Sequence, residues 1–232
     1  MTREPVTDRR SGRADGPTAE VVGVVSSVLL LAVVAGTVGL SLLGWAAGSG
    51  CAVLLGVLLL RGRQGAALGP AGQVTLTRAV LGCVVTALVT DRTDATVLLV
   101  VVASLALVLD AADGWVARRT ATTSRWGARF DMEVDAFLLL VLSAHLVSSL
   151  GWWVLAIGAL RYVFVAAARL LPWLNAPLPP SVWRRPIAAL QGIVLVAAIA
   201  LPGPVAGAAV AVALALLCWS FGRDVYSLAR QA

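Results

Sequence analysis

Long uncharged apolar runs recur along this 232-residue chain and restrict the folds that it can adopt. Runs of such length span a bilayer as helices, whereas transmembrane β-barrels alternate apolar and polar residues over strands of roughly ten residues. Hydrophobic residues make up 59% of the chain, and its mean hydropathy of +0.91 is far from that of a soluble globular domain. We therefore expect an all-α integral membrane protein.

The apolar runs and the turn-like segments between them predict about eight membrane spans. These spans lie near residues 21–41, 46–60, 74–90, 95–117, 129–150, 152–171, 186–202 and 204–221. The run at 46–60 is short for a span, but an even number of crossings at 21–61 is needed to return the chain to its starting side. We therefore expect residues 21–61 to form a transmembrane hairpin.

The placement of arginine predicts the orientation, because short cytoplasmic loops are enriched in basic residues. All 18 basic residues are Arg. Those outside the spans gather at the loop ends of one side, which are 3–13, 61–63, 118–129, 184–185 and 223–230. Among the loop arginines only Arg92 falls on the opposite side. Both termini and the loop at 118–129 are therefore expected in the cytoplasm, in a multi-pass protein of the plasma membrane.

The net charge of +6 fits anionic lipid and nucleotide partners. Nucleic acid is not expected as a partner, because the arginines sit at helix ends and form no patch interleaved with aromatic residues. Cys51, Cys83 and Cys218 lie singly in apolar segments, so the sequence predicts neither a disulfide framework nor a zinc site. Residues 1–20 mix Arg with acidic residues and lack a hydrophobic period, which predicts a disordered cytoplasmic tail.

Two pairs of carboxylates interrupt the hydrocarbon pattern. Asp110 and Asp113 are three residues apart and Asp131 and Asp135 are four apart, so each pair lies on one helical face. At a rise of about 1.5 Å per residue, both pairs lie about 20 Å from the non-cytoplasmic ends of their helices. In a hydrocarbon core about 30 Å thick, this places both pairs toward the cytoplasmic edge of the bilayer. The spans at 95–117 and 129–150 are expected to be antiparallel neighbours whose carboxylates converge.

Converging carboxylates repel one another, and protonating all of them would remove the reason to keep them. A divalent cation resolves this conflict, and ligands that offer only oxygen favour a hard ion such as Mg²⁺ or Mn²⁺. An alternative interpretation pairs the carboxylates with nearby arginines at the helix ends, namely Arg118, Arg125 and Arg129. Glu133 points away from the face of Asp131 and Asp135 and is interpreted as a bystander.

The spacing Asp110-x2-Asp113-Gly114-x2-Ala117-Arg118-x8-Gly127-x3-Asp131-x3-Asp135 resembles the signature of the class I CDP-alcohol phosphotransferases, and every fixed position is filled. Looser similarity covers residues 70–224, which implies the six-helix catalytic membrane domain of that family, with 225–232 as a cytoplasmic tail. The resemblance implies phospholipid biosynthesis, in which a phosphatidyl group passes from a CDP-linked lipid such as CDP-diacylglycerol to an alcohol acceptor and CMP is released. It also implies a homodimer.

The resemblance also implies roles for single residues. Asp110, Asp113 and Asp131 would be ligands of two Mg²⁺ or Mn²⁺ ions, and Asp135 would be the general base and also touch the second ion. The implied contacts to the nucleotide and its diphosphate are Thr75, Arg78, Gly114, Ala117 and Arg118. On the acceptor side the implied contacts are Arg161, Arg169 and Arg185. Because a buried guanidinium needs an anionic partner, we expect Arg161 to face an Asp of the site or a phosphate of the acceptor.

Two other functions share some of these features. A membrane prenyltransferase also binds magnesium with intramembrane Asp clusters, but its motifs lack the Gly-x2-Ala-Arg continuation that follows Asp113 here. A cation or proton transporter places its carboxylates near the bilayer midplane between repeated halves, whereas this sequence shows no internal repeat. The sequence therefore favours the transferase over these alternatives.

Overall fold

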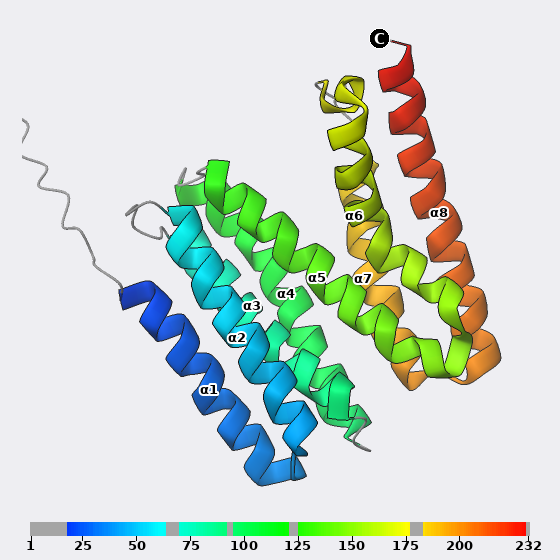
Figure 1. The fold of residues 1–232 in the computed structure, drawn as a ribbon. Helices are drawn as coiled ribbons and strands as arrows, with labels where there is room; N and C mark the ends of the chain where they lie inside the picture. Colours follow the sequence, from blue (N-terminus) through cyan, green and yellow to red (C-terminus); the bar gives the residue numbers. More distant parts are fainter. Residues whose placement is uncertain (1–17, 64–69, 92–94, 121–124, 177–182, 231–232) are drawn as a thin grey trace, which may run out of the picture.

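The computed structural model describes residues 18–230 except 64–69, 92–94, 121–124 and 177–182. Within these residues the chain forms α-helices and short 3-10 turns and no strand, which confirms the all-α prediction (Figure 1). The α-helices are α1 (Thr18–Val38), α2 (Leu42–Arg63), α3 (Pro70–Asp91), α4 (Thr96–Thr120), α5 (Arg125–Leu150), α6 (Leu155–Leu170), α7 (Arg184–Ala200) and α8 (Gly203–Ala229).

The helices follow the apolar runs because a bilayer offers backbone groups no partner other than one another. Six of the described helices are long and apolar enough to cross a membrane, while α4 and α7 contribute shorter apolar stretches at 96–112 and 186–200. The run predicted at 46–60 is part of the longer helix α2, which begins at Leu42. The structure is therefore that of an α-helical membrane protein.

Two glycines set where helices end. Gly39 (φ 72°) follows α1 and Gly151 (φ 94°) follows α5, and both have backbone angles in the left-handed region that favours glycine. Each backbone N–H donates back into the preceding helix, from Gly39 to the Ala35 carbonyl at 2.8 Å and from Gly151 to the Val147 carbonyl at 2.9 Å. These turns let α1 run antiparallel to α2 and α5 run antiparallel to α6 (Figure 1).

Helix α3 holds the centre of the bundle. The hairpin of α1 and α2 packs on one side of α3, and α4 and α5 pack on the other. Helix α7 contacts both α4 and α5, α6 packs against α5, and α8 packs against α7. Within the described residues α4 and α5 contact α3 and α7 far more than each other, which corrects the prediction that they are direct neighbours. Their carboxylates can converge because α3 and α7 hold α4 and α5 apart around a shared space.

Candidate active site

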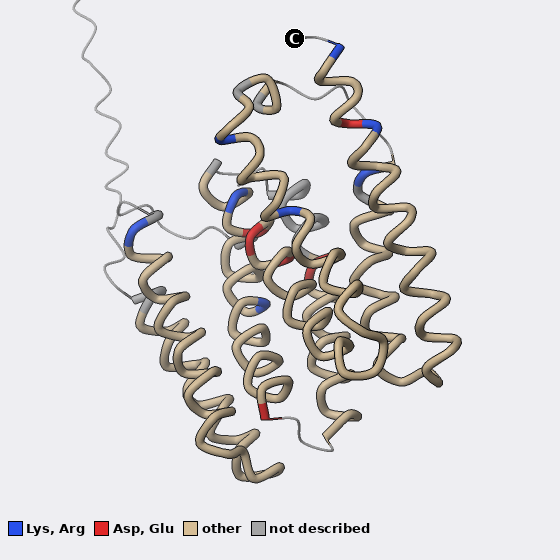
Figure 2. Tube along the Cα trace, turned by 45° about the vertical axis from the view of Figure 1, so that its right-hand side comes forward, with Lys and Arg blue, Asp and Glu red and all other residues tan. Residues whose placement is uncertain are grey.

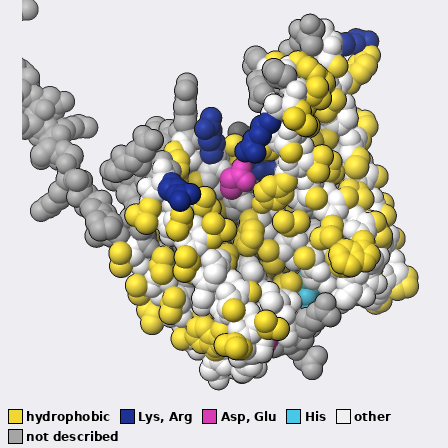
Figure 3. Space-filling view, viewed as in Figure 1, with side chains coloured by type: hydrophobic (Ala, Val, Ile, Leu, Met, Phe, Trp, Pro, Cys, Tyr) yellow, Lys and Arg dark blue, Asp and Glu magenta, His cyan; other side chains and the backbone are white. Residues whose placement is uncertain are grey.

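The predicted convergence of carboxylates is present for three of the four residues. Asp110 from α4 and Asp131 and Asp135 from α5 each offer one oxygen, and these oxygens lie within 4.8 Å of one another. The three side chains are 34–42% exposed, so they border an open space. Figure 3 shows carboxylate atoms in a hollow between arginines, with apolar side chains beyond it. The site lies toward the end of the bundle where most of the described charged residues gather (Figure 2).

Arg78 from α3 stands at the centre of this cluster. Its side chain is only 1% exposed, and its Nη1 atom lies 2.9 Å from an oxygen of Asp110 and 2.5 Å from one of Asp131. Its Nη2 atom pairs with Asp135. A planar guanidinium can donate hydrogen bonds to several carboxylates at once. A buried guanidinium needs anionic partners of this kind to offset its loss of hydration. The guanidinium of Arg78 thus lies among the carboxylates, and its predicted contact with the nucleotide stays a prediction.

The donor set fits a divalent cation. Arg78 brings one positive charge to these three carboxylates. All of the side-chain ligands are oxygens, as Mg²⁺ and Mn²⁺ prefer. At metal–oxygen distances of about 2.1 Å, two ligands of one ion lie at most about 4.2 Å apart, so small side-chain rotations would bring the present arrangement within range.

A cavity of about 770 Å³ opens in front of the carboxylates and is lined by α4, α5 and α7. Its polar wall carries the three carboxylates together with Arg184. Its apolar wall includes Leu107, Leu138 and Leu139. This volume is typical of small-molecule sites, and walls of both kinds suit an amphipathic ligand.

Arg184 is a site residue that the sequence analysis did not identify. It lines the cavity from the first turn of α7, and its Nε atom donates to an oxygen of Asp224 on α8 at 2.7 Å. The neighbouring Arg185 is the residue predicted to contact the acceptor, and its side chain lies outside the described residues. The signal that would have found Arg184 is Asp224, an acidic residue just after the last predicted span that invites a cationic partner.

Arg161 pairs with a glutamate outside the carboxylate cluster. Its Nη2 atom lies 2.6 Å from an oxygen of Glu133, so its partner in the protein is not an Asp of the cluster. A contact with the acceptor phosphate stays a prediction. Glu133 is the partner for a geometric reason, since two residues along a helix turn the side chain by about 200°. Glu133 therefore faces α6, while Asp131 faces the cavity. Glu133 is a bystander to the carboxylate cluster, as predicted, but it links α5 to α6.

The other predicted residues lie around this arrangement or outside the described part. Thr75 is buried on α3 one turn before Arg78, and Arg169 is exposed in the last turn of α6. The remaining predicted site residues lie on α4, but their side chains are outside the described residues: Asp113, Gly114, Ala117 and Arg118. Their roles stay predictions. In the alternative interpretation the carboxylates pair with helix-end arginines; Arg78 from α3 pairs with all three, and the side chains of Arg118 and Arg125 lie outside the described residues.

A comparison with known families shows to which family the chain belongs. The family model described as CDP-alcohol phosphatidyltransferase matches residues 70–219. This segment begins with α3 and contains Arg78 and the clustered carboxylates, while the hairpin of α1 and α2 lies outside it. Comparisons with curated proteins and with solved structures give no match.

Proposed function

Since this chain belongs to the CDP-alcohol phosphatidyltransferase family, we propose that it transfers a phosphatidyl group from CDP-diacylglycerol to an alcohol acceptor and releases CMP. Family membership confirms the resemblance predicted from the carboxylate spacing and identifies a membrane-embedded transferase of phospholipid head-group synthesis. The observation that carries the proposal is the convergence of Asp110, Asp131 and Asp135 on one cavity.

The cavity supports an amphipathic donor. The CDP-linked lipid has an anionic diphosphate at the junction between its nucleotide and its apolar chains. A diphosphate beside the carboxylates would need a cation between the two sets of negative charges. The oxygens of Asp110, Asp131 and Asp135 are suitable ligands for a divalent cation at that position. The leucines of the apolar wall, Leu107, Leu138 and Leu139, would contact the lipid part of the donor.

In this proposal Asp110, Asp113 and Asp131 would hold two divalent ions, and Asp135 would also touch the second ion. Family members are metal-dependent, and bound Mg²⁺ or Mn²⁺ would neutralise the diphosphate and stabilise the departing phosphate. Asp135 accepts the proton of the acceptor hydroxyl while the oxygen of that hydroxyl attacks the phosphorus of the phosphatidyl group. The bond from that phosphorus to the bridging oxygen breaks, and CMP leaves with the electron pair.

The acceptor would enter on the side of α6 and α7. Arg184 lines the cavity there, oriented by Asp224, and we keep Arg161, Arg169 and Arg185 as proposed acceptor contacts. A guanidinium held in this way suits an acceptor that carries a phosphate. We therefore propose glycerol 3-phosphate or inositol 3-phosphate as the acceptor class, in preference to serine.

The test uses purified full-length protein with CDP-diacylglycerol and each of four acceptors: glycerol 3-phosphate, inositol 3-phosphate, serine and phosphatidylglycerol. We expect CMP release with a phosphate-bearing acceptor and loss of that release in Asp135→Asn. The matched control is Asp91→Asn, since Asp91 lies in the loop-proximal turn of α3 and accepts a hydrogen bond from the Ser41 backbone N–H at 2.9 Å. Unchanged CMP release in Asp135→Asn would refute the assignment of the base.

The setting of the enzyme is part of the same proposal. From the arginine distribution we propose that both termini and the active site face the cytoplasm at the plasma membrane. From the family resemblance we propose a homodimer. Native mass spectrometry of the purified protein tests the dimer. The orientation is tested by placing single cysteines in the terminal tails of the protein and labelling them from outside in intact cells.

A further inference from the structure

The hairpin of α1 and α2 lies outside the matched segment, yet both of its helices pack along α3 (Figure 1). One buried apolar cluster, here called the rear cluster, joins α2 to the helices that carry the site. Its members are Ala52, Leu55 and Leu59 of α2, Leu76, Ala79, Val80 and Cys83 of α3, and Phe130 and Val134 of α5. The rear cluster thus connects the hairpin with α3 and α5 through residues that do not line the cavity.

The rear cluster and the site use adjacent residues of the same helices. On α5, Phe130 and Val134 directly precede Asp131 and Asp135 in the sequence. On α3, Ala79 directly follows Arg78. Neighbouring residues on a helix point about 100° apart, so the packing of one face fixes the direction of the other. A rotation of α5 in the rear cluster would therefore turn its two carboxylates.

The hairpin is held firmly against α3. A Cβ atom added at Gly23 of α1 would lie 2.9 Å from Cδ1 of Leu76. Helix α1 therefore packs closely against α3 at a position where glycine leaves room for the leucine. On α2, the Cys51 sulfur lies 3.2 Å from the Cys83 sulfur of α3. At the far end, the Ser41 backbone N–H just before α2 donates to Asp91 of α3. These contacts run along most of α3, so the hairpin supports this helix over its length.

We propose that Leu55 and Leu59 are positioning residues, through which α2 fixes the arrangement of Arg78, Asp131 and Asp135 at the proposed divalent-ion site. Leu59 is 0% exposed and Leu55 is 6% exposed. The inference rests on the metal role of these carboxylates that is part of the proposed function. Groups that only orient metal ligands typically change metal affinity by about 10–100-fold when they are removed. We expect the lower end of that range here, because the leucines act through the backbone of α3 and α5.

The experiment compares Leu59→Ala with Leu31→Ala in the full-length protein. Both leucines are 0% exposed and belong to the hairpin, but Leu31 packs in the separate larger core cluster with Val84 and Ala87 of α3. The two variants lose the same side-chain atoms, so they should lose similar thermal stability. The dissociation constant of Mn²⁺ is measured by electron paramagnetic resonance. We expect it to rise about ten-fold in Leu59→Ala only, and to return close to the original value in Leu59→Met.

Each outcome decides a different claim. Equal Mn²⁺ dissociation constants in Leu59→Ala and Leu31→Ala would overturn the positioning role and leave the proposed function intact. Failure of the unsubstituted protein to bind Mn²⁺ would overturn the metal role and this inference together. If Leu59→Ala does not fold, Leu59→Val and Leu31→Val form the same matched pair with a smaller loss of volume.

Discussion

Replacing Arg78 with Met is the sharpest test of the site, because one buried guanidinium pairs with three carboxylates. Met keeps much of the length of the side chain but removes its charge and its hydrogen-bond donors. The carboxylates of Asp110, Asp131 and Asp135 would then repel one another without an internal cation. We expect Arg78→Met to be less stable than the unsubstituted protein when no divalent ion is present.

The size of the effect follows from burial. Breaking a buried ion pair by removing one partner costs about 3–5 kcal/mol, because the other charge is left uncompensated. Here the guanidinium is 1% exposed, but the carboxylates are 34–42% exposed and water can solvate them in part. We therefore expect a loss of about 2 kcal/mol, below the range for a fully buried pair. A divalent ion at about 100 times its dissociation constant would return about 2.7 kcal/mol.

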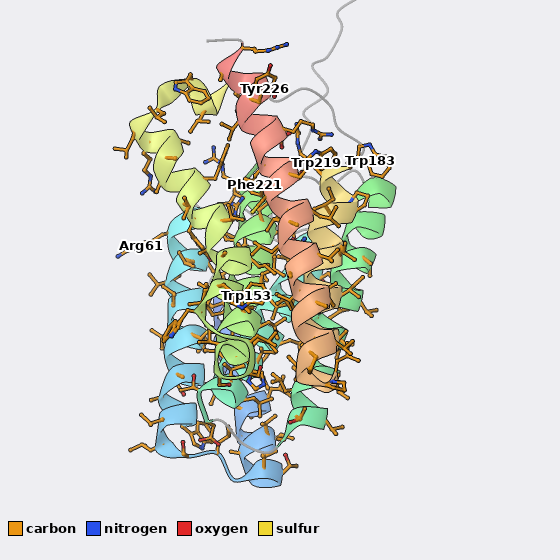
Figure 4. The ribbon with its side chains drawn as sticks, turned by 90° about the vertical axis from the view of Figure 1, so that its right-hand side faces the viewer. Arg61, Trp153, Trp183, Trp219, Phe221 and Tyr226 are labelled. Atoms are coloured by element: carbon orange, nitrogen blue, oxygen red, sulfur yellow. The ribbon has the colours of Figure 1, made fainter. Side chains whose placement is uncertain are left out.

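The assay is thermal unfolding in detergent with a chelator and with increasing Mg²⁺. In Arg78→Met the rise in melting temperature on adding Mg²⁺ should exceed that of the unsubstituted protein, because no guanidinium competes for the carboxylate oxygens. The control is Arg61→Met, since the Arg61 side chain lies on the outside of α2 (Figure 4). An equal or smaller Mg²⁺ effect in Arg78→Met would refute the idea that the guanidinium and the cation share one position.

Further predictions concern packing and substrate selection. A Cβ atom at Gly158 would lie 2.3 Å from the Leu140 Cα atom, so Gly158→Ala should lower the free energy of unfolding by about 1–3 kcal/mol. Gly36→Ala, which meets open space, should not lower it; equal melting temperatures would contradict this packing argument. Arg184→Ala should raise the Michaelis constant for the acceptor more than that for the donor, and Asp224→Asn should reproduce part of this change. Equal effects on both constants would indicate a general structural role for the pair.

The parts of the fold that were predictable depend on local periodicity. Each apolar run became a helix, because the membrane leaves a spanning backbone no other way to satisfy its hydrogen bonds. The convergence of Asp131, Asp135 and Asp110 was also predictable, since residues four apart share a helical face and equal depth can be counted along a helix. Both inferences use information that lies within one or two segments of sequence.

The contacts that were not predictable depend on which helix faces meet across the bundle. Arg78 is 32 residues before Asp110, and nothing local indicates that α3 packs against both α4 and α5. The partners of Arg161 and Arg184 were missed for the same reason, since Glu133 and Asp224 lie on helices whose rotation is set by packing. An arginine inside an apolar run does predict that some carboxylate faces it. The sequence alone does not predict which one.

The position of Arg78 bears on how such a site folds before any ion binds. Three carboxylates that converge at membrane depth would repel one another in an ion-free protein, and this repulsion would oppose the packing of α4 and α5 around their shared space. A guanidinium from α3 offsets part of that repulsion, so the helices can assemble first. The carboxylates remain partly exposed to the cavity, so a divalent ion can still reach their oxygens. In the proposed function, the residue that stabilises the ion-free fold therefore also limits the affinity for the ion.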